Sequence, residues 1–153
     1  MSDRASPPDS AILVLGDHPL KICYSRPSAR GRTVFGGLVP YGRTWRTGAN
    51  EPTLLHLPVA AEVAGVRLER GTYLLFTIPQ QDAWTVLFNT SEAATPLEMF
   101  SDMTEVGRGV ATVERLDHHV ETFTIRGGDG VGESDFIIEW ERLRARIRVR
   151  LLR

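Results

Sequence analysis

The stretch LVPYGRTWRTGANEP, residues 38–52, carries the side chains best suited to chemistry in this chain. It holds two aromatic rings and three grouped polar side chains: Tyr41, Trp45, Arg46, Asn50 and Glu51. A guanidinium can bind a carboxylate or a phosphate, a glutamate can act as a general acid or base, and an aromatic ring can stack on a sugar. The stretch is therefore compatible with a ligand-binding site or a catalytic site.

The same side chains can instead serve the fold. Burial of Trp45 would contribute about 1.5–3 kcal/mol and would bring Arg46 close to apolar surroundings, where its charge needs a partner. Glu51 is the nearest acid along the chain. We expect a guanidinium–carboxylate pair between Arg46 and Glu51, with Asn50 bridging nearby loop amides, and we favour this structural role over catalysis.

Other reactive residue types show no pattern of a known site. Cys23 is the only cysteine, which excludes an intrachain disulfide and a cysteine-based zinc site. The histidines lack the spacing of metal ligands, and His118 and His119 would point to opposite faces of a strand. We expect no metal and no cofactor.

Four arginines near the C-terminus alternate with apolar residues: Arg144, Arg146, Arg148 and Arg150. This period-two pattern is typical of a strand with a solvated face, and we expect its arginines to pair with Glu139 and Glu141 on a neighbouring strand. The alternative is an anion-binding or nucleic-acid-binding stripe. The net charge of -1 shows no basic excess, so we expect no nucleic-acid partner.

Size and composition indicate one soluble domain. The chain has 153 residues, of which 42% are hydrophobic and 24% charged. No apolar run approaches the roughly 20 residues of a membrane span, and the first residues lack the apolar core of a signal peptide. As written, the sequence predicts a cytoplasmic protein without a membrane span.

The elements that must position these residues are strands. We expect a disordered lead-in over residues 1–10 and a single all-β domain over residues 11–153. Short β-like runs separated by turn residues predict a jelly-roll-like β-sandwich of roughly eight to ten antiparallel strands. At most one short helix is expected, near residues 97–103.

Three hairpins are expected within this pattern. One turns at Ala64-Gly65, the second joins 71–79 to 84–89, and the third joins 136–141 to 144–152. The strands 71–79 and 84–89 are almost continuously apolar, so we expect them to be covered on both faces.

The motif YSRPSARGRTVFGGLVPYGRTWRTGANE (24–51), followed by GTYLLFTIP and WTVLFN, resembles a bacterial family of uncharacterised β-rich proteins. The resemblance implies a compact β-sandwich and a bacterial source, and it implies no catalytic residues. Many of the similar proteins are exported or lipid-anchored, so a periplasmic or cell-envelope location is the alternative to the cytoplasm.

Arg26 and Arg32 also lie in this motif, and convergence of both with Arg46 would create a net positive site. The candidate ligand-binding residues are Arg26, Arg32, Tyr41, Trp45, Arg46, Asn50 and Glu51. We favour a binding or interaction domain that recognises a small anionic or carbohydrate-like ligand or docks as an accessory subunit on a protein partner. The alternative is an enzyme of unknown reaction that uses Glu51, Arg46 and Tyr41.

Overall fold

Strands dominate the structure, and the only helix in the described part of the chain is a single turn. The computed structural model describes residues 6–152. The elements in chain order are β1 (Pro8–Leu15), β2 (His18–Ser25), β3 (Leu54–Leu57), β4 (Ala61–Val63), β5 (Val66–Leu68), β6 (Gly71–Pro79), β7 (Ala83–Thr90), α1 (Pro96–Met99), β8 (Thr104–Gly127), β9 (Asp129–Gly130) and β10 (Glu133–Leu151).

All of these strands belong to one ten-stranded sheet. Its order is β5-β4-β10-β8-β7-β6-β3-β2-β1-β9. The pairs are antiparallel except for β1 with β9, so the sheet is mixed, and it is not closed into a barrel. The predicted all-β class is confirmed. The predicted division into the two sheets of a sandwich is not confirmed, because hydrogen-bonded pairing runs continuously from β5 to β9.

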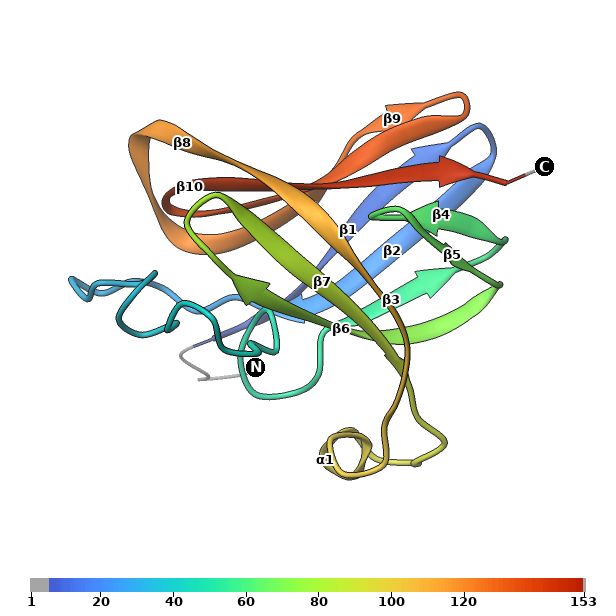
Figure 1. Ribbon diagram of the computed structural model, residues 1–153, viewed down its shortest axis with the longest axis horizontal. Helices are drawn as coiled ribbons and strands as arrows, with labels where there is room; N and C mark the ends of the chain where they lie inside the picture. The colour runs from blue at the N-terminus through green and yellow to red at the C-terminus, as the bar shows by residue number, and fades with distance from the viewer. Residues whose placement is uncertain (1–5, 153) are drawn as a thin grey trace.

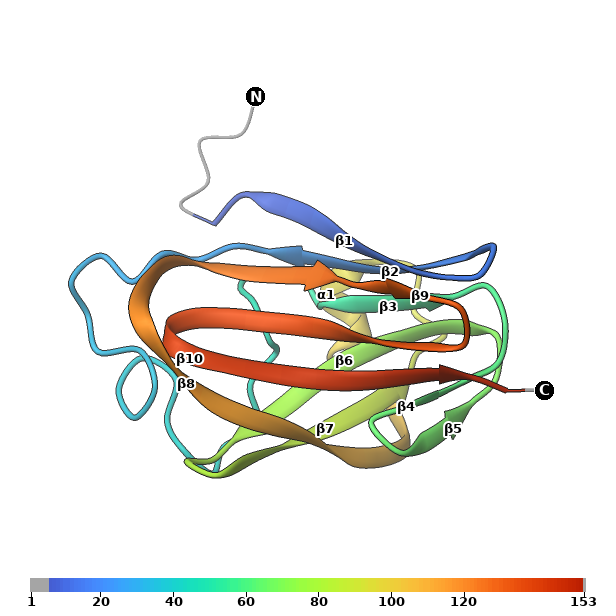
Figure 2. The ribbon, with the colours of Figure 1, turned by 90° about the horizontal axis from the view of Figure 1, so that it is seen from above.

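The sheet curves over on itself and encloses the core (Figures 1 and 2). β8 and β10 are long enough to bend across the molecule, and the end of β8 comes back against β1, where the Val14 N–H donates to the Gly128 carbonyl at 3.2 Å. Side chains from most strands are fully buried inside the curve. The largest are Trp84, Trp140, Phe88, Phe123 and Phe136.

β6 and β7 are covered on both faces, as their apolar sequences predict. A second, smaller cluster on their outer face is formed by Leu74, Phe76 and Leu87, and Met99 and Phe100 from the region of α1 pack against it. The helical turn therefore has a clear role, since it shields an apolar patch that would otherwise face water. Its position agrees with the short helix expected near residues 97–103.

The first two predicted hairpins are confirmed. β4 pairs with β5 around Ala64 and Gly65, whose φ angles of 52° and 84° are the positive values that a tight hairpin turn needs. β6 pairs with β7 from Leu74 to Pro79, opposite Asn89 to Trp84.

The predicted C-terminal hairpin is wrong. Residues 136–141 and 144–152 lie in one strand, β10, which pairs with β8 on both sides of Glu141. Glu141 adopts φ of 59°, which bends the strand without reversing it. No glycine or proline follows it to complete a turn. At the other end of the chain, β1 begins at Pro8, so residues 8–10 of the expected lead-in are part of a strand, while residues 1–5 lie outside the described residues.

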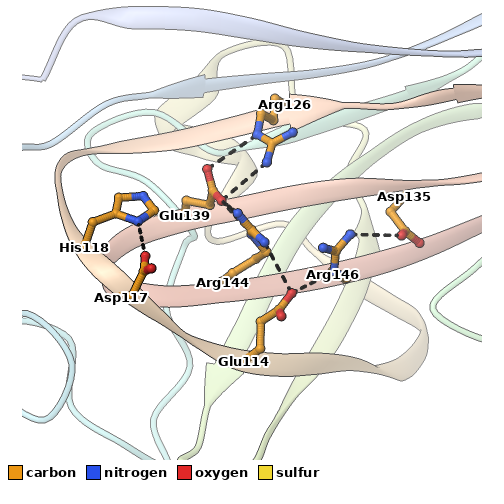
Figure 3. A network of polar contacts seen from close by, with 8 residues as sticks. All are labelled: Glu114, Asp117, His118, Arg126, Asp135, Glu139, Arg144 and Arg146. Atoms are coloured by element: carbon orange, nitrogen blue, oxygen red, sulfur yellow. Dashed lines mark hydrogen bonds and ion pairs between the residues drawn. The ribbon is translucent and has the colours of Figure 1, made fainter.

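The arginine face of β10 is a solvated, ion-paired surface, as expected, but its partners differ from the expected ones (Figure 3). Glu141 does not pair with this face, and Glu139 lies on the same strand as the arginines. The contacts are Arg144 with Glu139 and Glu114, Arg146 with Glu114 and Asp135, Arg148 with Glu133 and Asp135, and Arg150 with Glu62.

Glu139 is the buried centre of this network. Its carboxylate accepts hydrogen bonds from Arg144 Nε at 2.6 Å and from Arg126 at 3.4 Å. Burial acts to raise the pKa of Glu139, but the hydrogen bonds and charges of the two arginines outweigh burial, and the pKa lies below its ordinary value.

The close approach of β8 to β1 predicts that Gly127→Ala destabilises the fold. A Cβ at this position would lie 2.1 Å from the carbonyl oxygen of Ile12, so the backbone would have to move. We expect the free energy of unfolding to fall by about 1–3 kcal/mol in denaturant titrations. Gly132→Ala is the matched control because its methyl group enters open space, and it should change stability by less than about 0.5 kcal/mol. Equal stabilities of the two variants would contradict this packing.

The Glu139 network predicts a specific loss of stability in acid. Because its pKa is lower in the folded state than the ordinary 4.5, Glu139 contributes stability above pH 4.5 that is lost as the pH falls through the folded-state value. Glu139→Gln should therefore be less stable than the parent at neutral pH, and the difference should shrink as the pH falls below 4.5. Denaturant titrations across this range measure it, and a constant difference at every pH would count against the network.

Candidate ligand-binding site

A long segment between β2 and β3, residues 26–53, crosses one end of the curved sheet next to the bend of β8 (Figures 1 and 2). It contains no strand of its own but is tied down by backbone hydrogen bonds. The Ala29 N–H donates to the Glu121 carbonyl at 2.9 Å, and Trp45 and Thr77 exchange two bonds of 2.7 and 3.0 Å. Loops of this length in compact domains are usually functional, and this one is held in place by β8 and β6.

Five aromatic rings gather where this segment meets the sheet: Phe35, Trp45, Trp84, Phe123 and Trp140. Trp45 is at their centre. Its ring centroid lies 5.0 Å from that of Phe123 and 6.1 Å from that of Trp140, and the two indoles are nearly parallel at 20°. Each such pair contributes about 0.5–1.5 kcal/mol beyond the burial of its area, so the cluster fixes the loop rigidly on the core.

Glu141 attaches the first part of the segment to β10. Its two carboxylate oxygens accept hydrogen bonds from the Val34 N–H at 2.9 Å and the Phe35 N–H at 3.2 Å. The unusual φ of Glu141 turns its side chain out of the alternating pattern of the strand. As a result, one carboxylate positions Phe35 within the aromatic cluster.

A cavity of about 340 Å³ opens between the segment and the sheet. Among residues 6–152, its charged lining residues are Arg30 and Arg32, and no carboxylate of this part of the chain lines it. The remaining lining is mostly apolar, and it comprises Ser6, Pro27, Leu38, Val39, Trp45, Gly48, Ala49 and Trp140. The volume falls in the usual range for small-molecule sites.

Two of the seven predicted site residues, Arg32 and Trp45, line this cavity. Trp45 is only partly buried, because one side of its indole packs on the core while the cavity lies beside it. Arg32 is held by its own loop, donating from Nε to the Ala29 carbonyl and from Nη2 to the Ser28 carbonyl, both at 2.9 Å.

Arg26, Arg32 and Arg46 each bind different partners. Arg26 donates to the Phe123 carbonyl and the Thr124 hydroxyl, both at 3.0 Å, and lies 3.5 Å from a carboxylate oxygen of Asp9. Because each guanidinium binds different partners, these contacts do not support the convergence that a net positive site would need.

The expected clasp between Arg46 and Glu51 is also not formed. Within the described residues, Arg46 instead donates to the Asn50 carbonyl at 2.6 Å and stacks on the Phe100 ring, 4.6 Å from its centroid. Asn50 takes part through its backbone, at a φ of 63°. Glu51 lines a cavity with Cys23 and Tyr24, whereas Arg46 lies over Phe100.

Tyr41 and Glu51 line other cavities. Tyr41 lines one with His119 and Arg115, whereas Glu51 lines one with Cys23 and Tyr24. Arg46 lies on the Phe100 ring. The three residues of the catalytic alternative, Glu51, Arg46 and Tyr41, therefore lie at three different locations.

Sequence reasoning missed Arg30 and Trp140. Arg30 had a local signal, since it lies two positions before Arg32 in the same glycine-containing loop. Trp140 had none, because it lies in a distant strand, and only the fold stacks it on Trp45.

No group of three metal-ligating side chains of the His, Cys, Asp or Glu type occurs among residues 6–152. No helix in the same part of the chain is long and apolar enough to cross a membrane.

The role of Glu141 predicts that Glu141→Gln destabilises the protein. The amide of glutamine keeps one acceptor oxygen, but its NH₂ group would face one of the two N–H donors of the buried residues Val34 and Phe35. An unsatisfied buried donor costs about 1–3 kcal/mol, and we expect a loss of this size in denaturant titrations.

Glu133→Gln is the matched control, because it makes the same change on the same strand. Its side chain is 56% exposed and lies 3.6 Å from Arg148, and a surface ion pair of this kind contributes little. If both variants lost the same stability, the attachment by Glu141 would not be important for the fold.

Comparison with known proteins agrees with the resemblance in the motif. The model of one protein family, described as "Protein of unknown function (DUF2911)", matches residues 6–149. No curated protein and no solved structure matches the chain. The match extends over almost the whole of the described structure, so the chain belongs to the DUF2911 family of proteins of unknown function.

Proposed function

We propose that this protein is a binding domain for a small organic anion, a carboxylate carried on a ring with a flat apolar face. The observation that carries the proposal is a cavity of about 340 Å³ lined by two stacked indoles, in which the charged side chains from the described residues are two arginines.

The indoles supply a rigid apolar wall. Trp140 is 1% exposed, and its Nε1–H donates to the Glu121 carbonyl at 3.0 Å, so its ring cannot turn. Trp45 stacks on Trp140 and is held by the bridge to Thr77. A surface that is ordered before binding loses little conformational freedom, and this favours affinity for a flat ligand.

The arginines supply the charge. Arg32 uses Nε and Nη2 within its loop, which leaves further guanidinium N–H groups for an acceptor. Arg30 has a positive φ of 53°, and its backbone N–H donates to a Glu121 carboxylate oxygen at 2.8 Å. Its guanidinium makes no hydrogen bond or close ion pair within residues 6–152. A carboxylate is the natural partner of such guanidinium groups.

The size of the cavity favours a small ligand over a protein partner, since stable protein interfaces bury about 800 Å² on each side. The catalytic alternative gains no support, because Glu51, Arg46 and Tyr41 do not share a cavity with one another.

Paired ligands test the proposal. Isothermal titration calorimetry would compare glucuronate with glucose, and benzoate with benzyl alcohol, so that each charged ligand has a neutral counterpart. We expect the charged member of at least one pair to bind more tightly. Equal binding of charged and neutral members, or no binding of any, would overturn the proposal.

A pair of variants locates the binding. Arg30→Gln should weaken the affinity for the bound carboxylate roughly tenfold or more, the loss expected for one charge-assisted hydrogen bond, while the melting temperature stays unchanged. Arg43→Gln removes an exposed arginine of the same segment that does not line this cavity, and it should bind like the parent. The proposed site is wrong if both variants lose affinity equally.

A further inference from the structure

A second cavity, of about 440 Å³, lies where β8 bends against Glu141 of β10. The register between the two strands shifts on either side of Glu141, so β8 carries extra residues both between Arg115 and Val120 and between Val120 and Thr124. The extra length lets β8 turn outward here, and the cavity forms at this irregularity. Its lining shares no residue with the first cavity and includes Tyr41, Arg115, His119, Glu141 and Arg142.

The charges in this cavity differ from those of the neighbouring surface. β10 carries Arg142 and four further arginines, and each of these four forms an ion pair with a carboxylate. Arg115 and Arg142 line the same cavity, yet among residues 6–152 neither forms an ion pair or a side-chain hydrogen bond. Two guanidinium groups from adjacent strands therefore lie at one place without a hydrogen-bonded carboxylate, although the charge of Arg142 also acts on Asp117.

The one acid that lines the cavity does not neutralise them. Both carboxylate oxygens of Glu141 are already engaged by the N–H groups of Val34 and Phe35. These donors occupy its oxygens and hold it away from a role as an arginine partner.

His119 adds a further donor. Its Nε2 lies 2.9 Å from a carboxylate oxygen of Glu121. The pKa of Glu121 is lowered first by this hydrogen bond and next by the Arg30 N–H, so the acid stays ionised beside the imidazole. The imidazole of His119 is therefore held in place at the edge of the cavity by Glu121.

We propose that this cavity binds a phosphate group, held by Arg115 and Arg142 with His119 and the Tyr41 hydroxyl as further hydrogen-bond donors. Guanidinium groups match the oxygens of phosphate in geometry and carry the opposite charge. The two linings differ in polarity. The first cavity combines its arginines with an apolar wall, whereas the second combines its arginines with an imidazole and a phenol. The phosphate can be free inorganic phosphate or the head of a phosphomonoester.

Titration with inorganic phosphate and with glycerol 3-phosphate tests the proposal, with sodium chloride at equal ionic strength as the control. Calorimetry should give saturable binding of at least one phosphate compound, and the tighter one identifies the source of the group. Absence of saturable binding by both would overturn the proposal.

Variants then place the binding. Arg115→Gln and Arg142→Gln should each weaken it about tenfold or more without lowering the melting temperature, since neither side chain forms a hydrogen bond or a close ion pair within residues 6–152. Arg148→Gln is the matched control, because it makes the same change on an exposed, ion-paired arginine of β10. An equal loss in Arg148→Gln would show that only the general charge matters and would contradict the site.

Arg30→Gln separates the two cavities. Phosphate binding should survive this change, because Arg30 does not line the second cavity. Loss of phosphate binding in Arg30→Gln with full binding in Arg115→Gln would assign phosphate to the first cavity and overturn the inference. Neither result depends on whether carboxylates bind the first cavity.

Discussion

The attachment of Val34 and Phe35 to the Glu141 carboxylate is the interaction on which both cavities depend. It lies at the one residue of β10 with positive φ, where the register with β8 shifts. By holding the two amides it places Phe35 among the tryptophans, and the loop that follows then covers the end of the sheet. The first cavity lies between that loop and the sheet, and the second lies at the irregularity in β10 itself.

Charge balance explains where recognition is favoured on this molecule. Most of the β8–β10 surface carries arginines paired with carboxylates, and such a surface offers little to an external anion because its charges are already satisfied. At the end of the sheet the pattern changes: arginines line both cavities, and the carboxylates nearby are engaged by backbone N–H groups or by histidine. Local excess of positive charge therefore arises in a chain whose net charge is -1.

Features that depend on neighbours along the chain were predicted well. The all-β class, the β4–β5 and β6–β7 hairpins and the double-sided burial of β6 and β7 follow from turn residues and from apolar periodicity, which act over a few residues. The C-terminal hairpin was predicted wrongly because the local sequence does not show which strand β10 pairs with. Pairing with β8 on both sides of Glu141 keeps the strand continuous through the bend.

The sequence by itself determined the strands, the loop that crosses the end of the sheet, and two of the side chains that line its cavity, Arg32 and Trp45. Only the tertiary structure decided which charges meet. Arg46 donates to the Asn50 carbonyl and stacks on Phe100 instead of pairing with Glu51. Trp140, which is distant in sequence, stacks on Trp45. The physical reason is that ion pairs and ring contacts depend on distance in space. In a curved sheet of strands that are far apart in sequence, strand register sets that distance, and no local sequence pattern encodes the register.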